Sequence, residues 1–165
     1  DGILGDTETN GLPWFCRTDL EHFRSLTWGS DLVLGRKTWE DMPDSVQEGR
    51  RIWVVTSEAN GTETDREPSR TEFFPINRHL LNTDRHVVIG GGASIYEQAL
   101  ATKGLVDRAF LTRLPISSGG NVKWPGLPEE WEKVRDKKVS VSEKLLEYDT
   151  SESATPHIHF EEWTW

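Results

Sequence analysis

The chain has 165 residues, enough for a substantial core but too few for two comfortable domains, so we expect residues 1–165 to form a single domain. A net charge of -9 disfavours nucleic acid as a partner, although an anionic small ligand needs only a local cluster of donors. One cysteine, Cys16, excludes an intramolecular disulfide and suits a reducing cytosol, and no stretch resembles a membrane span or a signal peptide. We therefore expect a cytoplasmic protein.

The first predicted elements are a polar loop over residues 5–11 and an amphipathic helix at about 19–27. Helical intervals separate Leu20, Phe23, Leu26 and Thr27. Thr18 and Glu21 have the spacing of a capping box, which also indicates a helix. Asp19 and Phe23 are four residues apart and share a face. An acid at this position more often complements the helix dipole than binds a ligand, so the helix alone leaves both interpretations open.

The remaining elements alternate between apolar runs and helical patterns. We predict strands at 32–34, 52–56, 86–89 and 109–112, helices at 36–42, near 77–81 and at about 94–102, a polar excursion at 57–72, and an antiparallel strand pair at 138–142 and 157–163. Pro43 is expected to stop the second helix. This order predicts an α/β fold: a predominantly parallel central sheet flanked by helices, with an antiparallel C-terminal edge.

Glycine follows two of the predicted strands. Gly35 leads into Arg36, Lys37 and Thr38 at a helix N-terminus, which favours an anion site, naturally for a phosphate. The run 90–92 allows close approach to the backbone before another helix. Neither junction matches a dinucleotide fingerprint or a P-loop. Each alone is ordinary turn chemistry, but two at one end of a sheet indicate a ligand site.

Three further patterns have competing interpretations. Arg50 and Arg51 either bind a carboxylate or form a solvated pair. His157 and His159 share a strand face, but zinc is disfavoured because no further ligand is near, and we predict no metal site. The tryptophans fit core or edge packing better than base stacking, at positions 28, 39, 53, 124, 131, 163 and 165.

Taken in order, these segments resemble the dihydrofolate reductase family over nearly the whole chain. The matching residues are Leu12-Pro13-Trp14 with Asp19-Leu20 and Phe23; Gly35 to Glu40; Gly49-Arg50; Val54 to Ser57; Val88 to Gly92 with Ile95 to Gln98; Leu111-Thr112; and Trp124-Pro125. The resemblance implies reduction of 7,8-dihydrofolate to 5,6,7,8-tetrahydrofolate with NADPH, in one-carbon metabolism. It also implies a monomer that binds antifolate-type inhibitors and neither nucleic acid nor membrane.

The resemblance also assigns roles to residues. Asp19 is implied as the acid that binds the pterin and supports protonation at N5, with Thr112 as its hydrogen-bonding partner and Trp14 ordering a water. Leu20 and Phe23 would pack on the substrate rings, and Arg50 would hold the glutamate α-carboxylate. The implied cofactor-binding residues are Leu4, Gly5, Arg36, Lys37, Thr38, Thr56, Ser57, Gly90, Gly91, Gly92, Ala93, Ser94, Ile95 and Tyr96. The Gly90–Gly91 bond corresponds to a cis bond of the family.

Four features depart from the family pattern. Family members have a further strand of roughly ten residues before the position of Asp1, and we expect such a strand, central in the sheet, in the full protein. Asn121 stands where the family often has an aspartate that accepts backbone N–H bonds from the active-site loop. That loop, 5–14, is slightly longer than usual, and Ala93-Ser94 adds a residue without a basic group, so phosphate binding depends more on Arg36.

Two alternatives remain open at this point. The first is a pyrimidine reductase of riboflavin synthesis, which shares the fold but is disfavoured by the Leu-Pro-Trp and Asp-Leu-x-x-Phe pattern. The second is a non-catalytic relative that binds nucleotide or has a structural role.

Overall fold

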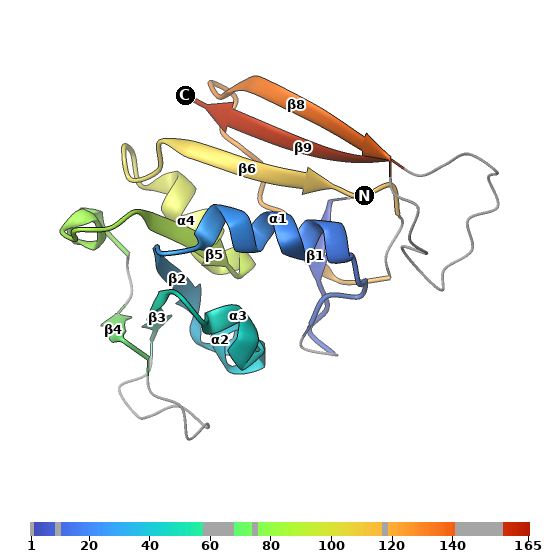
Figure 1. Ribbon diagram of the computed structural model, residues 1–165. Helices are drawn as coiled ribbons and strands as arrows, with labels where there is room; N and C mark the ends of the chain where they lie inside the picture. Colours follow the sequence, from blue (N-terminus) through green and yellow to red (C-terminus); the bar gives the residue numbers. More distant parts are fainter. Residues whose placement is uncertain (1, 9–10, 58–67, 74–75, 117–118, 141–156) are drawn as a thin grey trace.

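The computed structural model describes residues 2–8, 11–57, 68–73, 76–116, 119–140 and 157–165, and it contains three sheets (Figure 1). A four-stranded sheet has the order β4-β3-β2-β5, a three-stranded sheet has the order β6-β9-β8, and β1 pairs with β7. Residues 58–67 of the predicted polar excursion and 141–142 of a predicted strand lie outside the described residues.

The four-stranded sheet is parallel and forms the centre of the fold. Its strands are β2 (Asp31–Gly35), β3 (Arg51–Thr56), β4 (Arg70–Phe73) and β5 (Val87–Gly91). β2 and β3 read as continuous apolar runs because both faces of the sheet are covered. One face packs Val33, Trp53 and Val55 against residues of α4 and the segment before it, and the other packs Leu32 and Leu34 with residues of α2.

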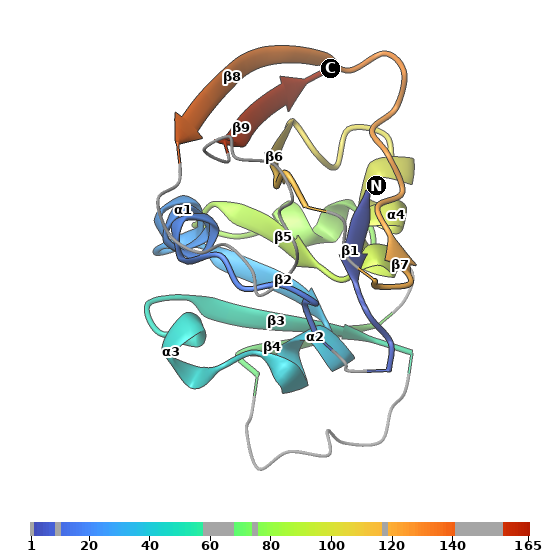
Figure 2. The same ribbon diagram turned by 90° about the vertical axis from the view of Figure 1, so that its right-hand side faces the viewer.

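Helices lie on both sides of this sheet (Figure 2). They are α1 (Arg17–Thr27), α2 (Arg36–Asp41), α3 (Asp44–Gln47), the 3₁₀ helix η1 (Arg78–Leu81) and α4 (Ala93–Ala101). The predicted helices are confirmed within two residues at each end, and α2 ends before Pro43 as expected. The short helix α3, which directly follows Pro43, was not predicted.

Helix α1 begins earlier than predicted, and its cap is a different residue. Cys16 is the N-cap, and its Sγ accepts a hydrogen bond from the Asp19 backbone N–H at 3.4 Å. Thr18 therefore lies inside the first turn, and the predicted capping box of Thr18 and Glu21 is wrong. The physical reason is that the chain already turns into the helix at Cys16, which has an extended backbone.

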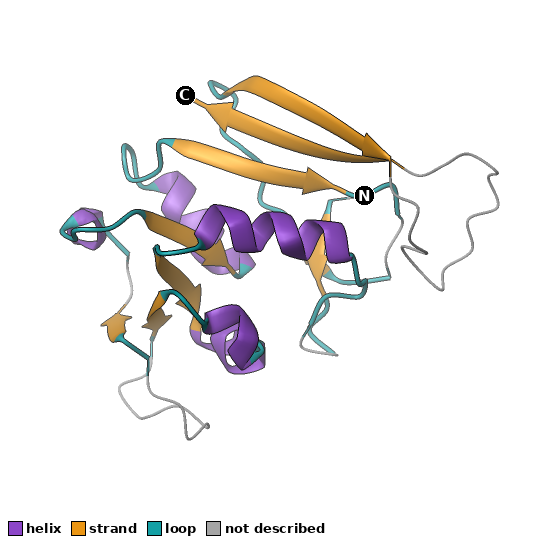
Figure 3. Ribbon diagram, in the orientation of Figure 1, coloured by secondary structure: helices purple, strands orange, loops and turns teal. Residues whose placement is uncertain are grey.

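The three-stranded sheet is antiparallel and lies on the other side of α1 in Figure 3. Its strands are β6 (Arg108–Arg113), β8 (Glu132–Ser140) and β9 (His157–Thr164), with β9 in the middle. The predicted antiparallel pairing of the C-terminal strands is confirmed, but β8 begins six residues before the predicted start at 138. The remaining pair is β1 (Ile3–Gly5) with β7 (Val122–Lys123).

β5 is an edge strand of the four-stranded sheet, and β6 is an edge strand of the three-stranded sheet. Among the described residues, β5 pairs only with β2 and β6 only with β9. The fold is thus the predicted α/β architecture, with the antiparallel edge present as a sheet of its own. Within the described chain, no helix has the length and apolar character needed to cross a membrane.

Candidate active site

The two glycine junctions meet at the C-terminal edge of the parallel sheet. Gly35 ends β2, and a Cβ atom placed on it would lie 3.1 Å from Ile95 Cγ1 and 3.7 Å from the Gly92 nitrogen. A Cβ atom on Gly92 would lie 3.0 Å from the Thr38 Oγ1. The N-termini of α2 and α4 therefore adjoin each other, as the sequence predicted from two junctions at one end of a sheet.

The glycine run has a different geometry at each residue. Gly90 is the extra residue of an irregular β2–β5 register, and a Cβ atom there would lie 2.7 Å from Leu32 Cδ1. The cis peptide bond joins Gly91 and Gly92, so the expected cis bond at Gly90–Gly91 is one residue too early. The extra residue in β5 shifts the bond relative to the simple count along the strand.

Backbone donors and cations lie at this edge. Gly92 caps α4 without a side-chain hydrogen bond, and in the described chain the amides of Ala93 and Ser94 donate to no group. Arg36 is half-buried and its Nη1 lies 3.5 Å from Glu40 Oε1, while Lys37 is exposed. The edge thus offers unpaired N–H groups and positive charge to an anion.

Three other residues predicted to bind the cofactor differ in how far they are exposed to solvent. Thr56 is buried at the end of β3, and the next residue, Ser57, is exposed. Ile95 is 1% exposed and belongs to the core, so any contact of Ile95 with a cofactor would involve its backbone.

Tyr96 connects the glycine edge to the acid on α1. A Cβ atom on Gly91 would lie 3.2 Å from the Tyr96 Oη, and the Tyr96 ring meets Trp124 edge-on with centroids 5.4 Å apart. Burial, and to a smaller extent the negative charge of Asp19, together raise the pKa of Tyr96 to about 12. Asp19 and the glycine edge therefore share one electrostatic environment.

The residues predicted around Asp19 are placed by three elements. Asp19, Leu20 and Phe23 are half-buried on α1, and Phe23 packs against the core beneath α2. Trp14 lies in a bend just before the helix. Thr112 is half-buried on β6, and within the described chain no hydrogen bond joins it to Asp19.

The loop before α1 is fastened to the strand pair β1–β7. Leu4 and Gly5 lie in β1, and Asn121 Oδ1 accepts a hydrogen bond from the Thr7 backbone N–H at 3.0 Å. Asn121 Nδ2 also donates to Thr7 Oγ1 at 2.8 Å. Asn121 therefore makes the loop contact expected of the family aspartate, through an amide oxygen in place of a charged one.

Arg50 is largely engaged within the protein. Its Nε donates to Thr27 Oγ1 at 2.8 Å, and its Nη atoms donate to the carbonyls of Val46, Glu48 and Arg24 at 2.6, 2.7 and 3.1 Å. Among the described residues, one of its five N–H groups has no acceptor. Sequence reasoning missed Thr27 and these carbonyls, since a backbone acceptor leaves no residue-type signal.

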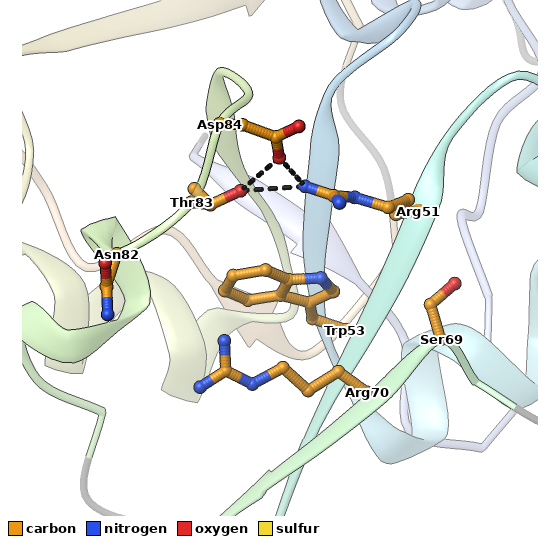
Figure 4. Close-up of a pocket in the computed structure, with 7 residues that line it drawn as sticks. All are labelled: Arg51, Trp53, Ser69, Arg70, Asn82, Thr83 and Asp84. Carbon is orange, nitrogen blue, oxygen red and sulfur yellow. Dashed lines mark hydrogen bonds and ion pairs between the residues drawn. The ribbon is translucent and has the colours of Figure 1, made fainter.

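Arg51, the other member of the predicted pair, begins β3 at the N-terminal edge of the sheet, away from the glycine edge. It lines a cavity of about 470 Å³ with Trp53, Arg70 and Asp84 (Figure 4). Its Nη2 donates to Asp31 Oδ2 at 2.8 Å and to Asp84 Oδ1 at 2.7 Å. Asp31 is fully buried, so Arg51 neutralises a core carboxylate and is neither a carboxylate receptor nor a solvated partner of Arg50.

A parallel sheet whose C-terminal edge combines glycines, unpaired amides and cations, next to a helix-borne acid, defines a nucleotide-dependent α/β enzyme. Comparison with known proteins gives the family: the dihydrofolate reductase family model matches residues 1–154. This chain belongs to the dihydrofolate reductase family.

Individual relatives agree with this. Dihydrofolate reductase of Neisseria meningitidis serogroup A is 29% identical over 140 residues, covering 84% of this chain and 83% of that protein. The Mycoplasma genitalium dihydrofolate reductase is 33% identical over 107 residues, covering 61% of this chain and 63% of that protein. A dihydrofolate reductase from Enterococcus faecalis, solved with NADP(H) and RAB-propyl, has a TM-score of 0.74 and 26% identity, covering 99% of this chain and 89% of that one.

Proposed function

We propose that this protein reduces 7,8-dihydrofolate to 5,6,7,8-tetrahydrofolate with NADPH. The observation that carries the proposal is the glycine edge, where close backbone approach, the N-terminus of α4 and the charge of Arg36 and Lys37 come together. Tyr96 of α4 adjoins this edge, and the charge of Asp19 on α1 acts on it. Family membership and the structural neighbour solved with NADP(H) support the same activity. The relatives carry the reductase name and give no support to a pyrimidine reductase.

The glycine edge fits the phosphates of NADPH. Bare glycines permit close approach, the amides of Ala93 and Ser94 have no acceptor in the described chain, and Arg36 and Lys37 supply charge. We assign Thr38, Thr56 and Ser57 to the same cofactor, with Leu4, Gly5 and Tyr96 on the nicotinamide side. NADPH supplies the hydride that goes to C6 of dihydrofolate.

The chain's own residues bind and orient the substrate. Asp19 would accept hydrogen bonds from the amidine-like edge of the pterin and support protonation at N5, through a water that Trp14 orders. Leu20 and Phe23 would pack against the substrate rings. Thr112 of β6 would complete the polar contacts of the pterin.

Replacing Asp19 tests the reaction. Asp19→Asn removes the charge with little change in shape, so kcat/KM near neutral pH should fall by roughly 100-fold. The dissociation constant of NADPH should stay within about twofold. The measurement is the decay of NADPH absorbance with dihydrofolate, and NADPH binding is followed by fluorescence. Glu21→Gln makes the same change on the exposed side of α1 and should leave the rate unaltered. A wild-type rate in Asp19→Asn would contradict the assigned role.

The remaining N–H of Arg50 is proposed to donate to the glutamate α-carboxylate. Arg50→Lys removes the guanidinium and with it the one N–H assigned to the ligand, so KM for dihydrofolate should rise about tenfold. A dihydropterin without the benzoylglutamate group should show no such rise, which separates carboxylate binding from general damage. Arg51→Lys provides the control, because the guanidinium of the neighbouring Arg51 is bound to the buried Asp31. Equal rises for both substrates would exclude the assignment.

We further propose that residues 1–165 act as one domain and as a monomer in the cytoplasm, without nucleic acid. The net charge of -9 and the single cysteine support this.

A further inference from the structure

His22 lies on α1 three residues after Asp19, outside the residues assigned above. Its ring contacts the ring of Phe160 on β9, with centroids 4.2 Å apart and planes tilted by 44°. The imidazole is half-buried. It therefore connects the helix that carries the acid to the antiparallel sheet.

Phe160 occupies the centre of a cross-strand row. Its partner on β6 is Thr112, and its partner on β8 is Lys137. Directly opposed residues of antiparallel strands project from the same face, so Thr112 and Lys137 lie on the face that meets His22. Phe160 also packs in a small cluster with Cys16, the N-cap of α1, and with Ile158. The contact of His22 with Phe160 therefore links the helix that carries Asp19 to the strand pair in which Phe160 lies opposite Thr112.

Among the described residues, the charges that act on His22 are those of Asp19 and Lys137. Asp19 acts from its own helix and Lys137 from β8, whereas Phe160 of β9 and Thr112 of β6 carry no charge. Burial lowers the pKa of His22 below its ordinary range, Asp19 opposes this shift, and Lys137 adds to it. The neutral ring is therefore favoured more than in an exposed histidine, and protonation at low pH places a cation in a half-buried contact.

We propose that His22 is a positioning residue for the reaction: its neutral ring, stacked on Phe160, holds Asp19 of α1 in register with Thr112 of β6, and acidification weakens this contact. The proposal rests on the proposed function, because Asp19 and Thr112 are the groups positioned. An imidazolium favours water over an aromatic, half-buried contact, so its formation pulls the helix away from the sheet.

Titration of the ligand-free protein by NMR tests the positioning without turnover. The His22 ring, assigned by its absence in His22→Phe, should titrate below pH 6.5, and the Asp19 and Thr112 amides should shift with the same midpoint. In Asp19→Asn the His22 midpoint should fall, because a negative charge that favours the imidazolium has been removed. Amides that do not follow His22, or an unchanged midpoint, would overturn the proposal.

Kinetics provide the second arm. His22→Phe keeps an aromatic ring that cannot ionise, so its kcat/KM relative to wild type should rise about threefold from pH 7.5 to pH 5.5. His22→Ala loses the contact and should lower kcat/KM about tenfold at both pH values, with NADPH affinity unchanged. His86→Gln, at an exposed histidine before β5, should show a constant ratio to wild type. A constant ratio of kcat/KM in His22→Phe to that in wild type would overturn the proposed pH dependence. If the wild-type protein shows no turnover, the proposed function is wrong, and the NMR titration alone then decides whether His22 positions Asp19 and Thr112.

Discussion

The two larger sheets are held together in different ways. β2 of the parallel sheet is buried along its length except at Gly35, whereas β8 of the antiparallel sheet is exposed at every residue except Val139. The parallel sheet is stabilised by apolar burial on two faces. Among its described residues, the antiparallel sheet has only a small apolar cluster around Ile158, and to this it adds its hydrogen-bond ladder and cross-strand ion pairs such as Arg113–Glu161 at 2.9 Å and Arg108–Glu162 at 3.0 Å. Substitutions in the two sheets should therefore differ sharply in cost.

The largest effect is expected at Trp39, which is fully buried against the parallel sheet. Trp39→Ala leaves a cavity and removes the Nε1 hydrogen bond to Gln47, so the free energy of unfolding should fall by about 3–5 kcal/mol. Urea denaturation followed by circular dichroism measures it. Trp39→Phe, which keeps most of the volume, should cost clearly less. A loss below about 1 kcal/mol in Trp39→Ala would mean that burial is not what stabilises this sheet.

A buried carboxylate in each sheet gives the next comparison. Asp31→Asn should cost about 2–3 kcal/mol and Glu161→Gln about 1–2 kcal/mol, because Asp31 is fully buried whereas Glu161 is bound by the exposed Arg113. Equal costs in urea denaturation would remove the distinction between the two sheets.

The buried carboxylate Asp31 should also make the stability of the parallel sheet depend on pH. Burial alone would raise the pKa of Asp31, but hydrogen bonds from Arg51 and Thr83 and the charge of Arg51 lower it overall. A lowered folded-state pKa means that this stability is present above about pH 4 and is lost as pH falls through the folded-state value. The acid-induced loss of stability should therefore be smaller in Asp31→Asn than in wild type, as measured by urea midpoints against pH.

The smallest effect is expected at Val134, the extra residue at an irregularity of β8, which is 56% exposed. Val134→Ala should change the free energy of unfolding by no more than about 0.5 kcal/mol. The same substitution at the buried Val54 of β3 should cost about 2 kcal/mol. If both variants unfold at the same urea concentration, Val134 of β8 stabilises the fold more than its exposed side chain indicates.

This contrast also explains how far the sequence predicts the fold. The apolar runs of β2, β3 and β5 were predicted because both faces of a covered parallel strand must be apolar. The first six residues of β8, Glu132 to Lys137, are mostly charged and lack alternation, so no pattern marks them as a strand. β4 was missed for a related reason, since Arg70–Phe73 is short and mostly polar.

The site was predictable where residue types carry the chemistry. Glycines at the ends of β2 and β5, the acid of α1 and the amide of Asn121 lie where the sequence placed them. The acceptors of Arg50 are mostly backbone carbonyls, which have no residue-type signature. The contact of His22 with Phe160 could likewise not be predicted from the sequence, because it depends on the packing of α1 against β9, which is distant along the chain.

Cys16 gives the molecule a built-in chemical reporter. It is the one cysteine of the chain, its side chain is 3% exposed, and its sulfur caps α1 while packing beside Ile158 of β9. A thiol reagent can reach that sulfur only after the helix start separates from the sheet. The rate of labelling therefore measures how often this junction opens, and ligands that fasten α1 in place should slow it.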